Sequence, residues 1–179
     1  MVEKYFDECR LLSDLRHPNI VQFLGICFLD TETSSTTNLP VLVMERLQCS
    51  LDDLLENTPN IPFSKKCSIL QDVARGLVYL HSHDPVIIHR DLTARNVLLN
   101  SAMVAKIADM GNSRIVDIRP DQLARTMTRG VPGTIVYMGP EAFEVPPKYG
   151  PMLDMFSFGH LALFTATQEF PGDLLPSTY

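Results

Sequence analysis

The sequence predicts a mixed α+β fold, and two kinds of pattern carry that prediction. Long segments place apolar residues three or four positions apart, as on one face of a helix, whereas short runs rich in β-branched residues indicate strands. The chain has 179 residues, of which 45% are hydrophobic and 20% are charged. This composition is that of one folded domain and not of a disordered chain.

The N-terminal part is predicted to be a helix followed by a β-hairpin. Glu3 to Arg16 present one apolar helical face, and Pro18 ends the helix because proline disfavours the helical region for the residue before it. Ile20 to Leu29 and Pro40 to Glu45 are rich in apolar and β-branched residues, and the run between them is polar. We expect these two runs to pair as strands across a long connection.

Two helices are predicted next, each with a serine placed to cap it. Ser50 with Asp53 resembles a capping pair for a short helix through Glu56, because a serine oxygen accepts from an N–H group that the first helical turn leaves unpaired. Ser64 is placed to cap a longer helix that ends at His81. The apolar face of this helix consists of Cys67, Leu70, Val73, Ala74, Leu77 and Leu80.

The remainder is predicted to hold small strands, a long irregular stretch and a buried helix. Asp109 to Glu141 shows little periodicity, and a connection of that length is functional or disordered. Leu153 to Gln168 is apolar nearly all round, so we expect a buried helix there. The small strands are Val86 to Ile88, Val97 to Leu99 and Val104 to Ala108.

Charge and cysteine usage exclude several classes of function. The net charge is −6 and no run of Lys or Arg stands out, so we expect no nucleic-acid partner. The four cysteines stand singly, as reduced thiols do in a cytoplasmic protein or in the intracellular part of a larger one. Met155 to Ala166 is too short to span a bilayer, so we expect no membrane segment in this chain. A metal site on His81 and His83 is the weaker interpretation, since the end of a helix explains both.

Two motifs carry the chemistry. Residues 89–96 read HRDLTARN and residues 109–111 read DMG, which resemble the catalytic loop and the D-F-G motif of eukaryotic protein kinases. The resemblance implies that Asp91 accepts the proton of the substrate hydroxyl, and that Asn96 and Asp109 hold Mg²⁺ against the phosphates of ATP. The implied partners are a protein substrate and ATP.

Further positions match the family once the motifs are aligned. The resemblance places Glu8 where the family pairs a glutamate with its ATP-binding lysine. It places Glu45 and Leu47 in the hinge that binds adenine, and Leu98 under the adenine ring. Leu12, Phe23, His89 and Met110 match the side chains that the family stacks across its two lobes.

Asp154 begins the last predicted helix in the string DMFSFG, which resembles D-V-W-S-F-G of the family. A buried carboxylate needs compensation, and in the family it receives N–H groups from the catalytic loop. A simple helix cap is the alternative interpretation.

The stretch from Asp109 to Glu141 matches the family's activation segment. The resemblance implies that Thr126 or Thr128 is phosphorylated and that Arg90, in the catalytic loop, receives the phosphate. Unmodified loop threonines are the alternative.

The acceptor hydroxyl is the least determined feature. Serine/threonine kinases carry a lysine two positions after the catalytic aspartate, where this chain has Thr93, and Arg95 matches the D-L-A-A-R-N loop of tyrosine kinases. The segment GTIVYMGPE resembles the serine/threonine pattern instead. We give the catalytic loop more weight, because it is the segment that places a positive charge near the transferred phosphate. We therefore favour the tyrosine kinase or tyrosine-kinase-like branch and place Arg95 with the catalytic residues.

The resemblance covers essentially the whole chain and implies a partial two-lobed kinase fold, truncated at both ends. Residues 1–46 correspond to a remnant of the N-lobe and residues 47–179 to the C-lobe through its central buried helix. The glycine-rich loop and the strand lysine that grip ATP have no counterpart in the sequence. We therefore expect a fragment of an active kinase with at most trace activity of its own and marginal stability. The alternative is a catalytically dead, pseudokinase-like scaffold.

Overall fold

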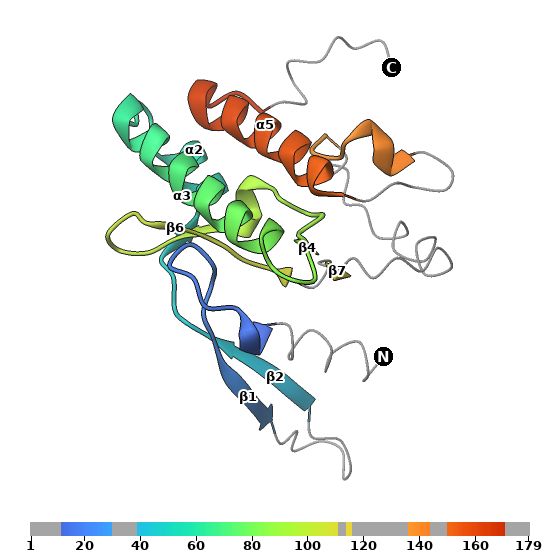
Figure 1. Cartoon of the computed structure of the whole chain (residues 1–179). Helices are drawn as coiled ribbons and strands as arrows, with labels where there is room; N and C mark the ends of the chain where they lie inside the picture. The colour runs from blue at the N-terminus through green and yellow to red at the C-terminus, as the bar shows by residue number, and fades with distance from the viewer. Residues whose placement is uncertain (1–11, 30–38, 111–113, 116–135, 144–149, 171–179) are drawn as a thin grey trace.

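The computed structural model describes residues 12–29, 39–110, 114–115, 136–143 and 150–170 (Figure 1). Within these ranges the fold is mixed α+β, with small antiparallel sheets and two long helices, as predicted. Of the predicted first helix, Glu3 to Arg16, residues 12–16 are described; residues 12–14 are helical, and the helix ends there, two residues before the predicted end. No helix in the described part of the chain is both long and apolar enough to cross a membrane.

The predicted hairpin is present. Strand β1 (Phe23–Leu29) pairs antiparallel with β2 (Leu39–Met44) and projects away from the helices (Figure 1). The prediction began this strand at Ile20, which was too early. Ile20 forms a parallel bridge with Ile107 instead, and the N–H of Val21 donates to the carbonyl oxygen of Ile107 at 2.9 Å. The segment that enters the hairpin is therefore tied to the body of the domain.

One capping prediction is confirmed and the other is wrong. Helix α2 (Leu51–Asn57) begins with a complete capping box, in which Ser50 and Asp53 each accept from the other's backbone N–H. Helix α3 (Phe63–His81) begins instead after Pro62, so Ser64 lies inside its first turn and caps nothing. Proline is well suited to a helix start because its ring fixes φ near the helical value.

The small strands form two further sheets besides the hairpin. Strands β3 (Cys49–Ser50), β5 (Val97–Leu99) and β6 (Ala105–Ile107) form one sheet, and the pair β4 (Ile87–Ile88) and β7 (Arg114–Ile115) forms another. The sequence did not predict β3 or β7. Both have two residues, too few to show a period of two.

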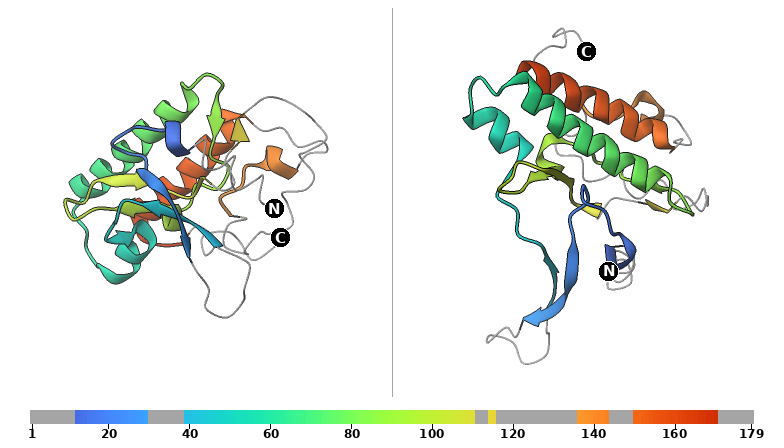
Figure 2. Two further views of the ribbon diagram at one scale, coloured as in Figure 1. Left: turned by 90° about the horizontal axis from the view of Figure 1, so that it is seen from below. Right: turned by 60° about the vertical axis from the view of Figure 1, so that its left-hand side comes forward.

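The core lies where α3 packs between β6 and helix α5 (Pro151–Thr167) (Figures 1 and 2). A Cβ atom on Gly76 of α3 would lie 2.8 Å from Cδ1 of Ile107 and 2.9 Å from the carbonyl oxygen of Asn19, so glycine permits this close approach. The prediction that α5 is buried holds for one side only. Met152, Met155, Phe156 and Leu163 of α5 are exposed on the described surface.

Candidate active site

Asp154 fixes the start of the catalytic loop. Its carboxylate is fully buried, with Oδ2 accepting from the backbone N–H of His89 at 2.9 Å and Oδ1 from that of Arg90 at 2.8 Å. The predicted N–H groups from the catalytic loop are therefore present, and a mere cap is the wrong interpretation. Arg90 is held at φ +69°, a left-handed conformation that costs free energy and persists only where neighbouring bonds determine it.

His81 is a partner of Asp154 that the sequence did not reveal. Its Nε2 lies 2.8 Å from Oδ2 of Asp154, and because a carboxylate only accepts, this nitrogen carries the proton. The helix end that explains His81 in the sequence thus delivers it to the catalytic loop. Among the described residues no group of three or more His, Cys, Asp or Glu side chains is arranged to hold a metal ion, which leaves the His81–His83 metal site without support.

His89 links the catalytic loop to the strand that precedes Asp109. Its ring is fully buried, with Nε2 2.9 Å from the carbonyl oxygen of Ala108 and Nδ1 3.3 Å from the N–H of Asp91. A carbonyl must accept, so Nε2 carries the proton and Nδ1 accepts. One neutral tautomer satisfies both contacts.

Asp91, Asn96 and Asp109 are brought together by two hydrogen bonds. Asn96 belongs to the 3₁₀ turn η1 (Ala94–Asn96), and its Nδ2 donates to the carbonyl oxygen of Asp91 at 2.8 Å. The carbonyl oxygen of Asn96 accepts from the N–H of Ala108 at 2.8 Å, which places Asp109 next to the loop. Asp109 has φ +60° and an exposed side chain.

These residues fit the Mg²⁺ that the resemblance implies. With Nδ2 donating to Asp91, the Oδ1 atom of Asn96 remains as the acceptor, and Asp109 supplies a carboxylate. Amide and carboxylate oxygens are the hard ligands that Mg²⁺ takes, usually together with phosphate oxygens. The donor set therefore suits a metal held jointly by Asn96, Asp109 and a bound phosphate.

The hinge is tied to β5 and β6. The N–H of Gln48 donates to the carbonyl oxygen of Leu99 at 2.8 Å, and Ser50 pairs with Leu98, so the hinge segment runs beside β5. Leu47 and Leu98 are both half-buried, as expected of side chains beside an open apolar slot. The adenine contacts of Leu47 and Leu98 remain predictions.

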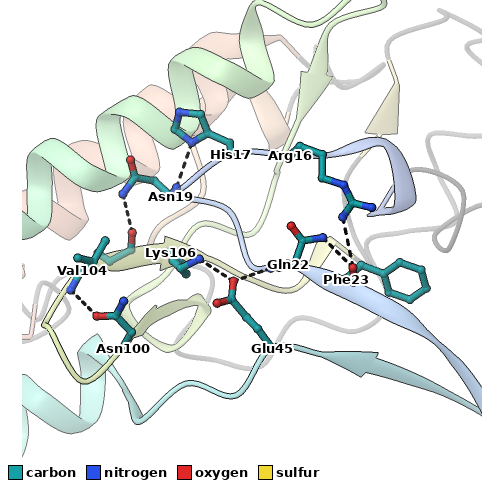
Figure 3. Close-up of polar contacts among 10 residues, drawn as sticks. Arg16, His17, Asn19, Gln22, Phe23, Glu45, Asn100, Val104 and Lys106 are labelled. Atoms are coloured by element: carbon teal, nitrogen blue, oxygen red, sulfur yellow. Dashed lines mark hydrogen bonds and ion pairs between the residues drawn. The ribbon is translucent and has the colours of Figure 1, made fainter.

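Glu45 makes an additional contact that sequence did not indicate. Figure 3 shows its side chain directed toward Lys106 and Gln22. Oε1 accepts from Nζ of Lys106 at 2.6 Å and from the N–H of Gln22 at 2.7 Å, and the Glu45 N–H donates to the carbonyl oxygen of Gln22. The side chain thus joins the hairpin to β6, and only the Glu45 carbonyl remains as the predicted adenine contact.

Arg95 makes a contact that the sequence did not indicate. Its Nε donates to Oδ2 of Asp52 in α2 at 2.9 Å, and its side chain is 72% exposed. Its catalytic role remains a prediction. Thr93 is buried. Tyr137 also packs here: burial, followed by the charge of Asp52, raises the pKa of its hydroxyl to about 12, so it stays protonated.

The other predicted residues fall into two groups. Leu12, His89 and Met110 are buried and Phe23 packs against the core, as the stacked arrangement requires. Glu8, Thr126 and Thr128 lie outside the described residues, so their roles remain predictions.

Known proteins resemble this chain over most of its length. Residues 1–169 match the family model described as protein tyrosine and serine/threonine kinase. Over 98% of its length the chain is 33% identical to U-box domain-containing protein 34 of Arabidopsis thaliana, and over 96% it is 34% identical to the probable serine/threonine-protein kinase drkB of Dictyostelium discoideum. Over 90% of its length it is 39% identical to the receptor-like serine/threonine-protein kinase SD1-7 of Arabidopsis thaliana.

An anchored loop bearing an aspartate and an asparagine, next to a second aspartate, is the arrangement that the resemblance to protein kinases implies. The chain belongs to the protein tyrosine and serine/threonine kinase family. It spans 21%, 23% and 18% of the lengths of the three relatives above, respectively.

Proposed function

We propose that this domain, within the full-length protein, transfers the γ-phosphoryl group of Mg·ATP to a serine or threonine hydroxyl of a protein substrate. The observation that carries the proposal is the loop held by Asp154, which presents Asp91 and Asn96 together. The names of the relatives, which include serine/threonine-protein kinases, favour serine and threonine.

In this mechanism Asp91 accepts the proton of the substrate hydroxyl, which increases the negative charge on the attacking oxygen. Asn96 holds the loop through its bond to the Asp91 carbonyl and, with Asp109, would hold Mg²⁺. When bound, the metal neutralises charge on the phosphates. The protein contributes mainly position, since Asp154 and His89 hold the backbone N–H groups up to Asp91, and Asn96 holds the Asp91 carbonyl.

The test is transfer of labelled phosphate from Mg·ATP by the full-length protein to peptides that contain serine, threonine or tyrosine. Asp91→Asn should lower the rate by at least about a hundredfold, because general-base catalysis contributes about 10²–10⁴-fold. Exposed Asp84→Asn serves as the control. Label on serine or threonine supports the proposal, whereas label on phosphotyrosine alone contradicts its finer part.

Regulation by phosphorylation at Thr126 or Thr128 belongs to the same proposal, with Arg90 as the receiving cation. Mass spectrometry of active full-length protein should find phosphate on at least one of the two threonines. Active protein with both unmodified would refute this part and leave the phosphoryl-transfer proposal intact.

A catalytically dead scaffold is the second candidate. Thermal unfolding of the full-length protein with and without Mg·ATP separates the candidates. A scaffold that binds no nucleotide shows no shift, whereas a kinase is stabilised by an amount that rises with the logarithm of the ligand concentration.

A further inference from the structure

A groove on the outer side of α3 lies apart from the site described above. It has a volume of about 560 Å³, within the range of ligand pockets. It is lined by residues of α3 that include Ala74, Arg75, Val78 and Tyr79, and by His17, whose ring stacks on that of Tyr79. Figure 3 shows the His17 ring beside α3.

The aromatic wall of the groove is held in place before any ligand arrives. The rings of His17 and Tyr79 stack at 4.9 Å with an interplanar angle of 18°. The Tyr79 hydroxyl oxygen accepts from the N–H of Arg16 at 3.0 Å, and Nδ1 of His17 accepts from the N–H of Asn19 at 3.1 Å. A wall fixed by these bonds loses little conformational freedom on binding.

The groove also exposes apolar surface that the core does not use. Val78 is 65% exposed, although its neighbours Leu77 and Leu80 are buried on the opposite side of the same helix. Ala74 lies one turn before Val78 and is half-buried. Together they form a short apolar strip beside the aromatic wall, large enough for one aliphatic or aromatic side chain.

The charged side chain of the groove is Arg75. It is the one charged residue among the described residues that line it, and its side chain is 62% exposed. Asp72 accepts from Nη1 of Arg75 with one oxygen and from the N–H of Ala105 with the other, which leaves the outer guanidinium N–H groups available. Nδ1 of His17 accepts from the N–H of Asn19, so the ring proton lies on Nε2, which can donate.

We propose that this groove docks a short acidic peptide segment of a partner protein. An apolar side chain of the peptide packs on Ala74 and Val78 against the His17–Tyr79 wall, and a neighbouring carboxylate binds Arg75. Charge complementarity selects this occupant, because the lining presents the guanidinium of Arg75, whose outer N–H groups Asp72 does not engage. The proposal does not depend on phosphoryl transfer.

The test uses phage-displayed random 12-residue peptides selected against the full 179-residue chain, with the selected peptides then synthesised and titrated by fluorescence anisotropy. We expect enrichment of peptides in which Asp or Glu neighbours Leu, Met or an aromatic residue. Arg75→Gln and Val78→Glu should each weaken binding about tenfold or more, since a charge-assisted hydrogen bond or a buried aliphatic contact contributes about 1.5–3 kcal/mol.

Two controls keep the result interpretable. Lys65→Glu reverses a charge on another face of α3 and should bind as the unchanged chain does, and far-UV circular dichroism checks that every variant is folded. Asp91→Asn should also bind normally, which separates this proposal from the proposed activity. Failure to enrich acidic peptides, or equal binding by Arg75→Gln and Lys65→Glu, would overturn it.

Discussion

The catalytic loop and the β1–β2 hairpin differ in what surrounds their apolar side chains. Beside the loop, Leu92 and Leu80 are 0% exposed and packed in one core, whereas in the hairpin Leu24 is 63% and Phe28 is 59% exposed. The loop is also held by side-chain hydrogen bonds from α3 and α5, while the hairpin is held chiefly by pairing between its own strands. Two-stranded hairpins alone are marginal in water. We therefore expect the part that carries the chemistry to depend little on the hairpin for its stability.

The largest effect is expected at the anchor of the loop. Asp154→Ala leaves the buried N–H groups of His89 and Arg90 and the ring of His81 without their acceptor, so it should lower the free energy of unfolding by about 3–5 kcal/mol. Urea denaturation followed by circular dichroism measures the change. Exposed Asp84→Ala is the matched control, and an equal loss in both variants would show that Asp154 anchors nothing.

One substitution made in both regions tests the comparison itself. Leu80→Ala removes a buried side chain and should cost about 2–5 kcal/mol through lost burial and a cavity. Leu24→Ala removes an exposed one and should change the unfolding free energy by less than about 0.5 kcal/mol, while reducing self-association measured by light scattering. Similar losses for the two variants would mean that the hairpin belongs to the core.

A smaller effect is expected at the joint between the two regions. Lys106→Met and Glu45→Gln each disrupt the partly buried ion pair between β6 and the end of the hairpin, whose side chains are 13% and 26% exposed. A double-mutant cycle should give a coupling energy of about 1 kcal/mol. Hydrogen exchange at the Gln22 amide, which also donates to Glu45, should quicken in both single variants. A coupling energy of zero would contradict the interpretation that Glu45 connects the hairpin to β6.

The smallest effect concerns pH. Burial and Lys106 lower the pKa of His17 in the folded chain, so below its ordinary value of about 6.5 the unfolded state binds more protons than the folded state. The contribution of His17 to stability therefore falls as the pH decreases through this region. Urea midpoints between about pH 5 and 7.5 should decline less in His17→Gln than in the unchanged chain. Parallel curves would contradict the shift.

Sequence reasoning succeeded where a local pattern has one physical meaning. The Ser50–Asp53 capping box, the end of α3 at His81 and the strand Val97–Leu99 all follow from neighbouring residues, and the structure has them where they were predicted. The motif HRDLTARN likewise implied a role for each position before any contact was known.

The contacts that the sequence did not predict join residues that are distant in the sequence. His81 and Asp154 are 73 positions apart, and Lys106 and Glu45 are 61 apart, so no local period could have joined them. The exposed side of α5 was missed for a related reason. A helix that is apolar all round is expected to be covered on every side, but the sequence does not say which elements cover it.

The geometry at Asp154 also determines which amino acid the position accepts. Its two oxygens receive three donors, two from the backbone of the catalytic loop and one from His81. Asparagine would offer one oxygen and turn an N–H₂ group toward an N–H, and glutamate would need room for another methylene in a fully buried site. The position therefore favours aspartate over both, and any substitution there removes part of the acceptor that the N–H groups of the catalytic loop share with His81.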